Sequence, residues 1–102
     1  MPKETKKHHP PKHLQGVLWS ADVADLDLEE NKAYIIHQIL MFGTFEEILW
    51  LLKTYPKTII QKVFIERPMQ VYTTPTFHFI KDFVLGLDKQ NLPESRYVNS
   101  FY

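Results

Sequence analysis

Histidines near the N-terminus are the first side chains in this 102-residue sequence whose types suit metal chemistry. His8, His9 and His13 lie close together in the chain, and neutral imidazoles bind zinc, copper and nickel. A rigid zinc site needs about four ligands, and no cysteine or neighbouring carboxylate cluster completes this set. We therefore expect no metal site and no cofactor, and we interpret these histidines as part of a solvated tail.

His37 and His78 are the candidates for acid–base catalysis, and both lie within stretches of helical periodicity. A histidine that pairs with a carboxylate can move a proton. The sequence, however, supplies no nucleophile motif and no phosphate-binding loop for such a pair to serve. We therefore expect a protein that is not an enzyme.

A run of carboxylates precedes the first helical stretch and raises the question of a divalent cation. Its spacing lacks the central glycine and the terminal glutamate of a calcium-binding loop. Capping of the next helix explains Asp27 and Glu30, and the positive end of that helix favours Glu29 nearby. The run, which we interpret as structural, comprises Asp22, Asp25, Asp27, Glu29 and Glu30.

Lys57, Gln61 and Lys62 form the pattern that best suits nucleic-acid recognition. Residues 43–68 read as two short helices joined by a tight turn, and in a helix-turn-helix protein the second helix meets the bases and phosphates. Residues 17–88 nevertheless hold six basic and ten acidic side chains, and an acidic surface repels phosphate. A DNA-binding regulator is therefore the alternative function, and binding of nucleic acid is not favoured.

The helix expected after Thr44 carries more apolar residues than one buried stripe requires. A folded body of ~70 residues has little room for a fully buried helix. We therefore expect Trp50 and Leu51 to contribute to the binding of a protein partner or to a homo-oligomer, with Trp19, Tyr97 and Phe101 as further contact residues. The apolar residues of this helix are Phe45, Ile48, Leu49, Trp50, Leu51, Leu52 and Tyr55.

Capping signals divide residues 28–87 into four short helices. Three pairs fit capping boxes: Asp27 with Glu30, Thr44 with Glu47, and Thr58 with Gln61. Gly43 occupies the position of a left-handed residue that ends a helix, and Pro56 and Pro68 end the next two helices. Thr74 followed by Pro75 predicts the start of the last helix, whose apolar positions are Phe77, Ile80, Phe83, Val84 and Leu87, with Gly86 near its end.

These elements predict an all-α fold, a compact bundle of four short helices. The apolar share of 44% and the aromatic share of 14% favour a packed globule. We expect a flexible basic N-terminal arm at residues 1–16, the helical domain at 17–88 and a loose C-terminal tail at 89–102. No apolar run reaches the length that spans a bilayer, the N-terminus does not resemble a secretory signal, and cysteine is absent, so we expect a cytoplasmic protein with no membrane contact.

The order of the segments "VLWSAD", "LDLEENKAYIIHQILMFGTFEEILWLLKTY" and "TPTFHFIKDFVLGL" resembles a family of small bacterial and archaeal proteins of unknown function. The resemblance covers about residues 17–87. Ser20, His37, Gln38 and Pro56 depart from the family pattern. Genes of that family often lie beside a nucleotidyltransferase-type toxin gene, so the resemblance implies an antitoxin-like or accessory protein whose partner is such a toxin.

Overall fold

The computed structural model describes residues 8–99. Four α-helices dominate this range: α1 (Lys32–Phe42), α2 (Phe45–Thr54), α3 (Lys57–Glu66) and α4 (Thr74–Phe79), which continues as the π-helical turn η3 (Ile80–Val84). Short 3-10 helices form η1 (Lys12–Gly16), η2 (Val23–Asp25) and η4 (Glu94–Arg96). Within residues 8–99 there is no β-strand, only an isolated bridge between Tyr72 and Val98. The expected all-α class is therefore confirmed.

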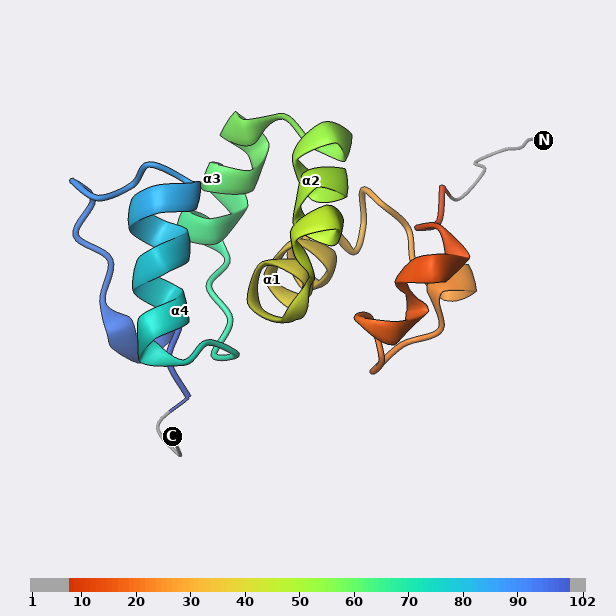
Figure 1. The fold of residues 1–102 in the computed structure, drawn as a ribbon, viewed down its shortest axis with the longest axis horizontal. Coiled ribbons are helices and arrows are strands. Elements are labelled where there is room, and N and C mark those ends of the chain that lie inside the picture. Colours follow the sequence, from red (N-terminus) through yellow and green to blue (C-terminus); the bar gives the residue numbers. More distant parts are fainter. Residues whose placement is uncertain (1–7, 100–102) are drawn as a thin grey trace.

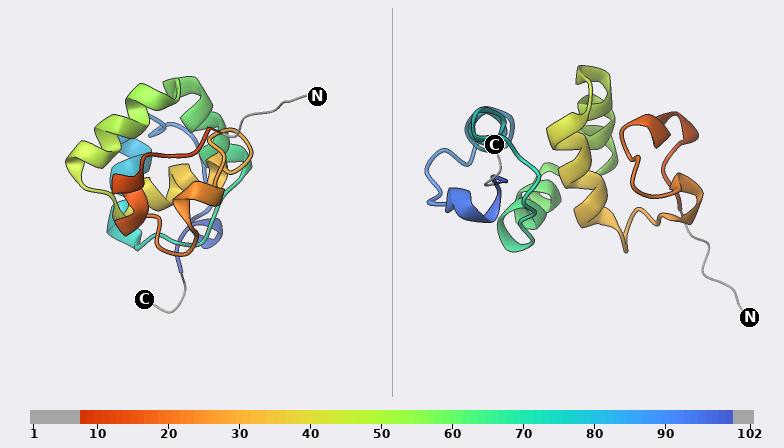
Figure 2. Two further views of the ribbon diagram at one scale, coloured as in Figure 1. Left: turned by 90° about the vertical axis from the view of Figure 1, so that its right-hand side faces the viewer. Right: turned by 90° about the horizontal axis from the view of Figure 1, so that it is seen from below.

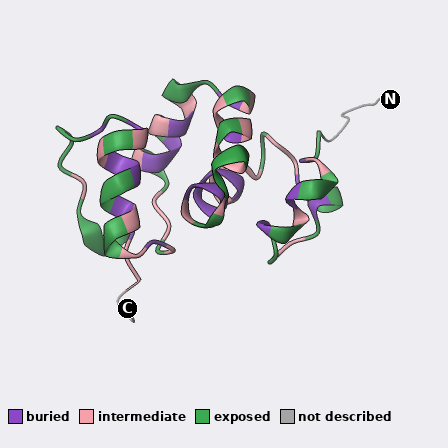
Figure 3. Cartoon of the chain, viewed as in Figure 1, coloured by how far each residue is buried: buried purple, intermediate pink, exposed green. Residues whose placement is uncertain are grey.

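The elements follow one another along a body that measures 45 × 25 × 23 Å (Figure 1). The 3-10 segments near the N-terminus form one end, α1 and α2 come next, then α3, and α4 forms the other end with the C-terminal segment. The view from below shows the same order (Figure 2). Helix α1 packs against both α2 and α3 and is largely buried (Figure 3). In the described part of the chain, no helix is long and apolar enough to cross a membrane.

The corner between α1 and α2 depends on one glycine and one capping box. Thr44 accepts a hydrogen bond from the backbone N–H of Glu47, and the Glu47 carboxylate accepts one from the N–H of Thr44, as predicted. The expectation of a left-handed Gly43 is wrong, because its φ is −75°. Glycine is required there by close packing instead: a Cβ atom would lie 2.6 Å from the carbonyl oxygen of Ile39.

Helix α1 begins later than the sequence predicted. The Asp27 carboxylate does accept hydrogen bonds from the N–H groups of Glu29 and Glu30, at 2.9 and 2.8 Å, but these bonds cap only a preceding turn. The side chain of Asn31, rather than that of Glu30, accepts from the N–H of Asp27. The backbone becomes α-helical at Lys32, so the capping box from Asp27 to Glu30 is wrong as a start of α1.

Helices α3 and α4 also begin differently from the prediction. Pro56 is the N-cap of α3, and the Thr58–Gln61 capping box does not form because the Gln61 side chain donates to the carbonyl of Leu85 at 2.6 Å. Thr73, one residue before the predicted Thr74, caps α4 by accepting from the N–H of Thr76. A shift of one residue at a helix end is a small error, whereas the role of Gln61 is a different interaction altogether.

The π-helical turn after α4 changes which side chains are buried. In an α-helix, Val84 would follow Ile80 on the buried face, but the N–H of Leu85 bonds to the carbonyl of Ile80 and Leu85 is buried instead. Phe83, one of the predicted apolar positions of the last helix, is 80% exposed. It packs against Phe79 on the outer side, with 6.1 Å between ring centroids.

An aromatic core joins α3, α4 and the C-terminal segment. The Tyr97 ring stacks on Phe64 and Phe77, with centroid separations of 4.7 and 4.8 Å. Tyr72 packs edge-on against Phe64 at 5.8 Å. The Tyr97 hydroxyl donates to the carbonyl of Phe64, and the N–H of Tyr72 donates to the carbonyl of Tyr97. We refer to Phe64, Tyr72, Phe77 and Tyr97 as the aromatic core.

The segments before and after the helices pack on the body more closely than expected. Pro10 and Leu14 are buried, and the N–H of Leu28 donates to the carbonyl of His8 at 2.8 Å, so the predicted arm at 1–16 is wrong from residue 8 onward. At the other end, buried Tyr97 shows that the predicted loose tail is wrong up to Asn99. Residues 1–7 and 100–102 lie outside the described range.

Candidate functional site

The corner between α1 and α2 exposes a group of large apolar side chains. Trp19 is 57% and Phe45 is 76% exposed, and Phe42 and Leu49 are also open to solvent. The Trp19 and Phe42 rings meet edge to face, with centroids 4.6 Å apart. We call this surface the corner patch and define it as Trp19, Phe42, Phe45 and Leu49.

Each side chain of the corner patch has a position that the secondary structure explains. Phe42 is the last residue of α1 and Phe45 is the first residue of α2, so they flank the two-residue turn at Gly43 and Thr44. Leu49 follows Phe45 by four residues and therefore lies on the same face of α2. The capping box at Thr44 and the close packing at Gly43 fix this corner.

Hydrogen bonds hold the loop that carries Trp19. The Gln15 amide donates to the carbonyls of Leu18 and Ala21, at 3.0 and 2.7 Å, on either side of Trp19. The hydroxyl groups of Ser20 and Tyr34 lie 2.8 Å apart and tie the same loop to α1. The exposed Trp19 ring is therefore presented by a well-supported backbone.

The predicted partner-binding residues occupy several different environments. Leu51 has no exposed surface and Tyr97 is almost fully buried, so both belong to the core and cannot contact a partner. Trp50 is partly buried and packs against the core, and Phe101 lies outside the described residues. Among the predicted partner-binding residues within 8–99, only Trp19 is largely exposed.

Phe42, Phe45 and Leu49 were not among the predicted contact residues; Phe45 and Leu49 were only part of the apolar set of the helix after Thr44. The apolar excess of the helix after Thr44 was correctly recognised, but its exposed part is Phe45 and Leu49. A signal was present in the sequence, since Phe42 and Phe45 stand at the two ends of a tight turn. Side chains at helix ends have fewer neighbours to cover them.

His37 is buried, and its two hydrogen bonds give it a structural role. Its Nε2 atom lies 2.7 Å from the carbonyl oxygen of Arg67 and its Nδ1 atom lies 2.8 Å from the Tyr72 hydroxyl. A carbonyl only accepts, so Nε2 carries the proton and Nδ1 accepts from Tyr72. Burial lowers the pKa of His37 from 6.5 to about 4, against the opposite effect of the Arg67 carbonyl. The neutral imidazole therefore links α1 to the end of α3.

The other histidines and the acidic run have structural contacts or lie exposed. His78 pairs with Glu94 at 2.7 Å and joins α4 to η4. Asp22 accepts from the N–H of Ala24 and thereby caps η2. His8, His9 and His13 are exposed. Within residues 8–99, no three histidine or carboxylate side chains gather closely enough to hold a metal ion.

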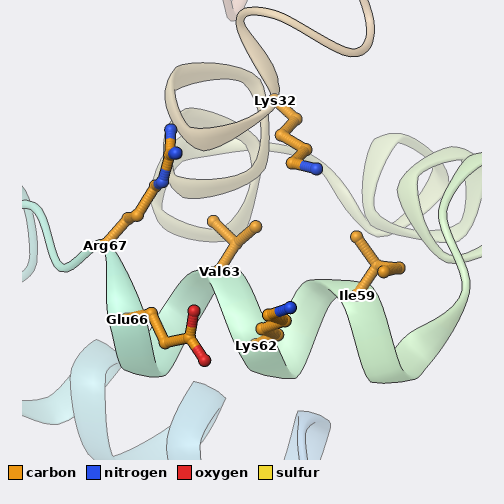
Figure 4. A pocket seen from close by; sticks show the side chains of 6 residues that line it. All are labelled: Lys32, Ile59, Lys62, Val63, Glu66 and Arg67. Carbon is orange, nitrogen blue, oxygen red and sulfur yellow. The ribbon is translucent and has the colours of Figure 1, made fainter.

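The three residues predicted to read DNA do not share one face of α3. The Gln61 amide donates to the carbonyl of Leu85. The Lys57 ammonium lies near Gly86, 3.9 Å from the position that a Cβ atom would take on that residue. Lys62 instead lines a groove beside α1, with a volume of about 210 Å³ (Figure 4). The residues that line this basic groove are Lys32, Ile59, Lys62, Val63, Glu66 and Arg67.

Comparison with known proteins places the first half of this architecture in a family. A family described as "Family of unknown function (DUF6922)" matches residues 14–64, which is half of the chain and contains the corner patch. Helix α4 lies beyond the matched range. No curated protein and no solved structure matches the chain. The chain belongs to the family of unknown function DUF6922.

Proposed function

We propose that the protein is a non-catalytic interaction module that binds a protein partner through the corner patch. The single observation that carries this proposal is the exposure of Trp19 and Phe45 on a corner that is otherwise firmly built. Aromatic side chains are favoured anchors at protein interfaces, and truncation of such an anchor costs ~2 kcal/mol or more of binding free energy.

The rigidity of the corner also favours binding. The Gln15 amide fixes the Trp19 loop and the Thr44 capping box fixes the start of α2. A surface that is already ordered loses little conformational entropy when a partner covers it. The Phe79–Phe83 pair on the α4–η3 segment is also exposed, but it comes from one continuous helical segment only.

The biological role that we propose is that of an antitoxin-like or accessory protein. This role rests on the resemblance to a family whose genes often neighbour a nucleotidyltransferase-type toxin, and the partner would then be that toxin. A second copy of the chain is the other occupant to be tested. The DNA-binding alternative gains no support, because Lys57 and Lys62 do not lie on one face with a free Gln61.

The experiment compares two charge insertions at equally exposed phenylalanines. Phe45→Asp places a carboxylate in the corner patch, and Phe83→Asp places one on the α4–η3 segment, where the parent ring is 80% exposed. The wild-type chain and both variants are used to capture proteins from the native host, and the retained partner is then produced and its affinity measured. We expect Phe45→Asp to weaken binding at least about tenfold and Phe83→Asp to leave it nearly unchanged.

Light scattering of the purified chain over a range of concentrations separates a homo-oligomer from a complex with another protein. Equal losses for Phe45→Asp and Phe83→Asp would contradict the corner patch as the contact surface. An unchanged affinity of Phe45→Asp, with helical circular dichroism intact, would contradict it as well.

A further inference from the structure

The basic groove beside α3 gathers half of the positive side chains of a body that is acidic as a whole. Residues 17–88 contain six basic side chains against ten acidic ones. Three of those six, Lys32, Lys62 and Arg67, line this one groove (Figure 4). Because Lys32 comes from α1, Lys62 from α3 and Arg67 from the position directly after α3, the fold brings together residues that are far apart in the sequence.

The charges in the groove are not balanced from within. Glu66 is the only carboxylate among its lining residues, and neither Lys62 nor Arg67 forms an ion pair within residues 8–99. Lys32 does pair with Glu29 at 2.8 Å, but the Glu29 side chain is largely exposed. An exposed pair of this kind contributes little and exchanges readily with water.

The position of Lys32 adds to the positive potential. Lys32 is the first residue of α1, and the N-terminal end of a helix carries the positive pole of its dipole. The first turn of α1 contains no acidic residue, and Asn31 makes no capping hydrogen bond with its side chain. The dipole of α1 therefore does not favour a cation at this place, whereas an anion held in the groove would offset the repulsion.

The size and lining of the groove limit what that anion is. Its volume of about 210 Å³ is below the ~300–1,000 Å³ of pockets for drug-sized ligands. Ile59 supplies apolar surface beside the cations, and the buried Val63 also lines the groove (Figure 4). A guanidinium forms paired hydrogen bonds with phosphate oxygens, and ammonium groups neutralise phosphate charge.

We propose that this groove binds the phosphate group of a small organic phosphate ester. Lys62 holds the phosphate from α3, Arg67 from the position directly after α3, and Lys32 from α1, while Ile59 contacts the organic part. The site is separate from the corner patch, because Lys32 begins α1 and Phe42 ends it. A DNA duplex is a poorer match, since its many phosphates would also meet a body in which residues 17–88 hold ten acidic and only six basic side chains.

The test is a titration of the full chain followed by ¹H–¹⁵N NMR. The probes are adenosine monophosphate, inorganic phosphate and sodium chloride at matched ionic strength. We expect both phosphates to shift amide signals around Lys32, Ile59 and Arg67, and adenosine monophosphate to bind several-fold more tightly because it also covers Ile59. Chloride should cause no such localised shifts.

Two variants and one control make the result specific to the groove. Lys62→Gln and Arg67→Gln each remove one exposed cation and should weaken binding about tenfold. Lys53→Gln removes an exposed cation on α2, outside the groove, and should leave the affinity within about twofold. The amide spectrum of each free variant verifies that the fold is kept.

Three results would overturn the proposal. The first is equal shifts with chloride and with phosphate. The second is an equal loss of affinity in Lys53→Gln and Arg67→Gln. The third is tighter binding of a short DNA duplex than of adenosine monophosphate, with Lys57→Gln weakening the duplex as much as Lys62→Gln does. This result would mean that the basic side chains bind nucleic acid.

Discussion

The aromatic core and the corner patch are both built from large apolar side chains, yet their surroundings are opposite. Phe64, Tyr72, Phe77 and Tyr97 are buried, and the Tyr97 and Tyr72 hydroxyl groups both have hydrogen-bond partners inside the protein. The rings of the corner patch have water on one side, although their backbone is held as firmly. The difference separates aromatic residues that stabilise the fold from those that remain available for binding.

The largest expected effect distinguishes the two regions by stability. Phe64→Ala removes the ring that contacts Tyr72, Phe77 and Tyr97, and we expect a loss of about 3–5 kcal/mol in the free energy of unfolding. Phe45→Ala removes an exposed ring and should change this free energy by no more than about 0.5 kcal/mol. Urea unfolding of both variants, followed by circular dichroism, provides the comparison. Similar losses for both would mean that the corner patch belongs to the core.

The second prediction uses the histidine beside the aromatic core. Because burial lowers the pKa of His37 from 6.5 to about 4, the unfolded chain takes up a proton between these two pH values and the folded chain does not. The contribution of this group to stability is therefore fully present above pH 6.5 and is lost as the pH falls toward 4. The expected loss is about 3 kcal/mol.

Urea unfolding at several pH values measures that loss. His37→Gln serves as the control, because it removes the titrating group and should flatten the pH dependence between 6.5 and 4 even if the variant is less stable. The same slope in the wild type and in His37→Gln would contradict the assignment to His37.

The third prediction concerns the backbone under the corner patch. A Cβ at Gly43 would lie 2.6 Å from the carbonyl oxygen of Ile39, so Gly43→Ala forces α1 and α2 apart and should cost about 1–3 kcal/mol. Gly16→Ala is the matched control, since nothing lies within 4 Å of the added methyl group. Thermal unfolding of the two variants tests this difference, and equal midpoints would show that Gly43 is not tightly packed.

The smallest expected effect on stability distinguishes the helix cap that forms, at Thr44, from the predicted cap that does not form, at Thr58. Thr44→Ala removes the capping box of α2 and should cost about 1 kcal/mol. Thr58→Ala changes a residue that caps no helix, because α3 begins at Lys57 after Pro56, and should stay within about 0.5 kcal/mol. Chemical unfolding resolves the two, and a larger loss for Thr58→Ala would contradict the observed start of α3.

The same contrast explains how far the sequence allowed prediction. The two ends of α2 were predictable because local rules apply: Thr44 and Glu47 form their capping box at its start, and Pro56 follows its end. The burial of Leu51 and the exposure of Phe45 could not be predicted, because positions on one apolar helix differ only in what packs against them.

Features that depend on contacts between distant segments could not be predicted from local sequence patterns. The π-helical turn after α4 shifts burial from Val84 to Leu85, and nothing in the spacing of apolar residues signals it. Tyr97 enters the core because a distant segment returns to α3 and α4. The basic groove likewise requires Lys32 to meet Lys62 and Arg67 across two helices.

The most direct test of the central claim is the solvent exposure of Trp19 with and without the partner. In a Trp50→Phe variant, Trp19 is the only tryptophan, and acrylamide quenching of its fluorescence reports its exposure. We predict strong quenching in the free protein and a several-fold reduction, with a shift of emission to shorter wavelength, when the partner is added at saturation. Unchanged quenching in a saturated complex would show that the corner patch remains in water and that the partner binds elsewhere.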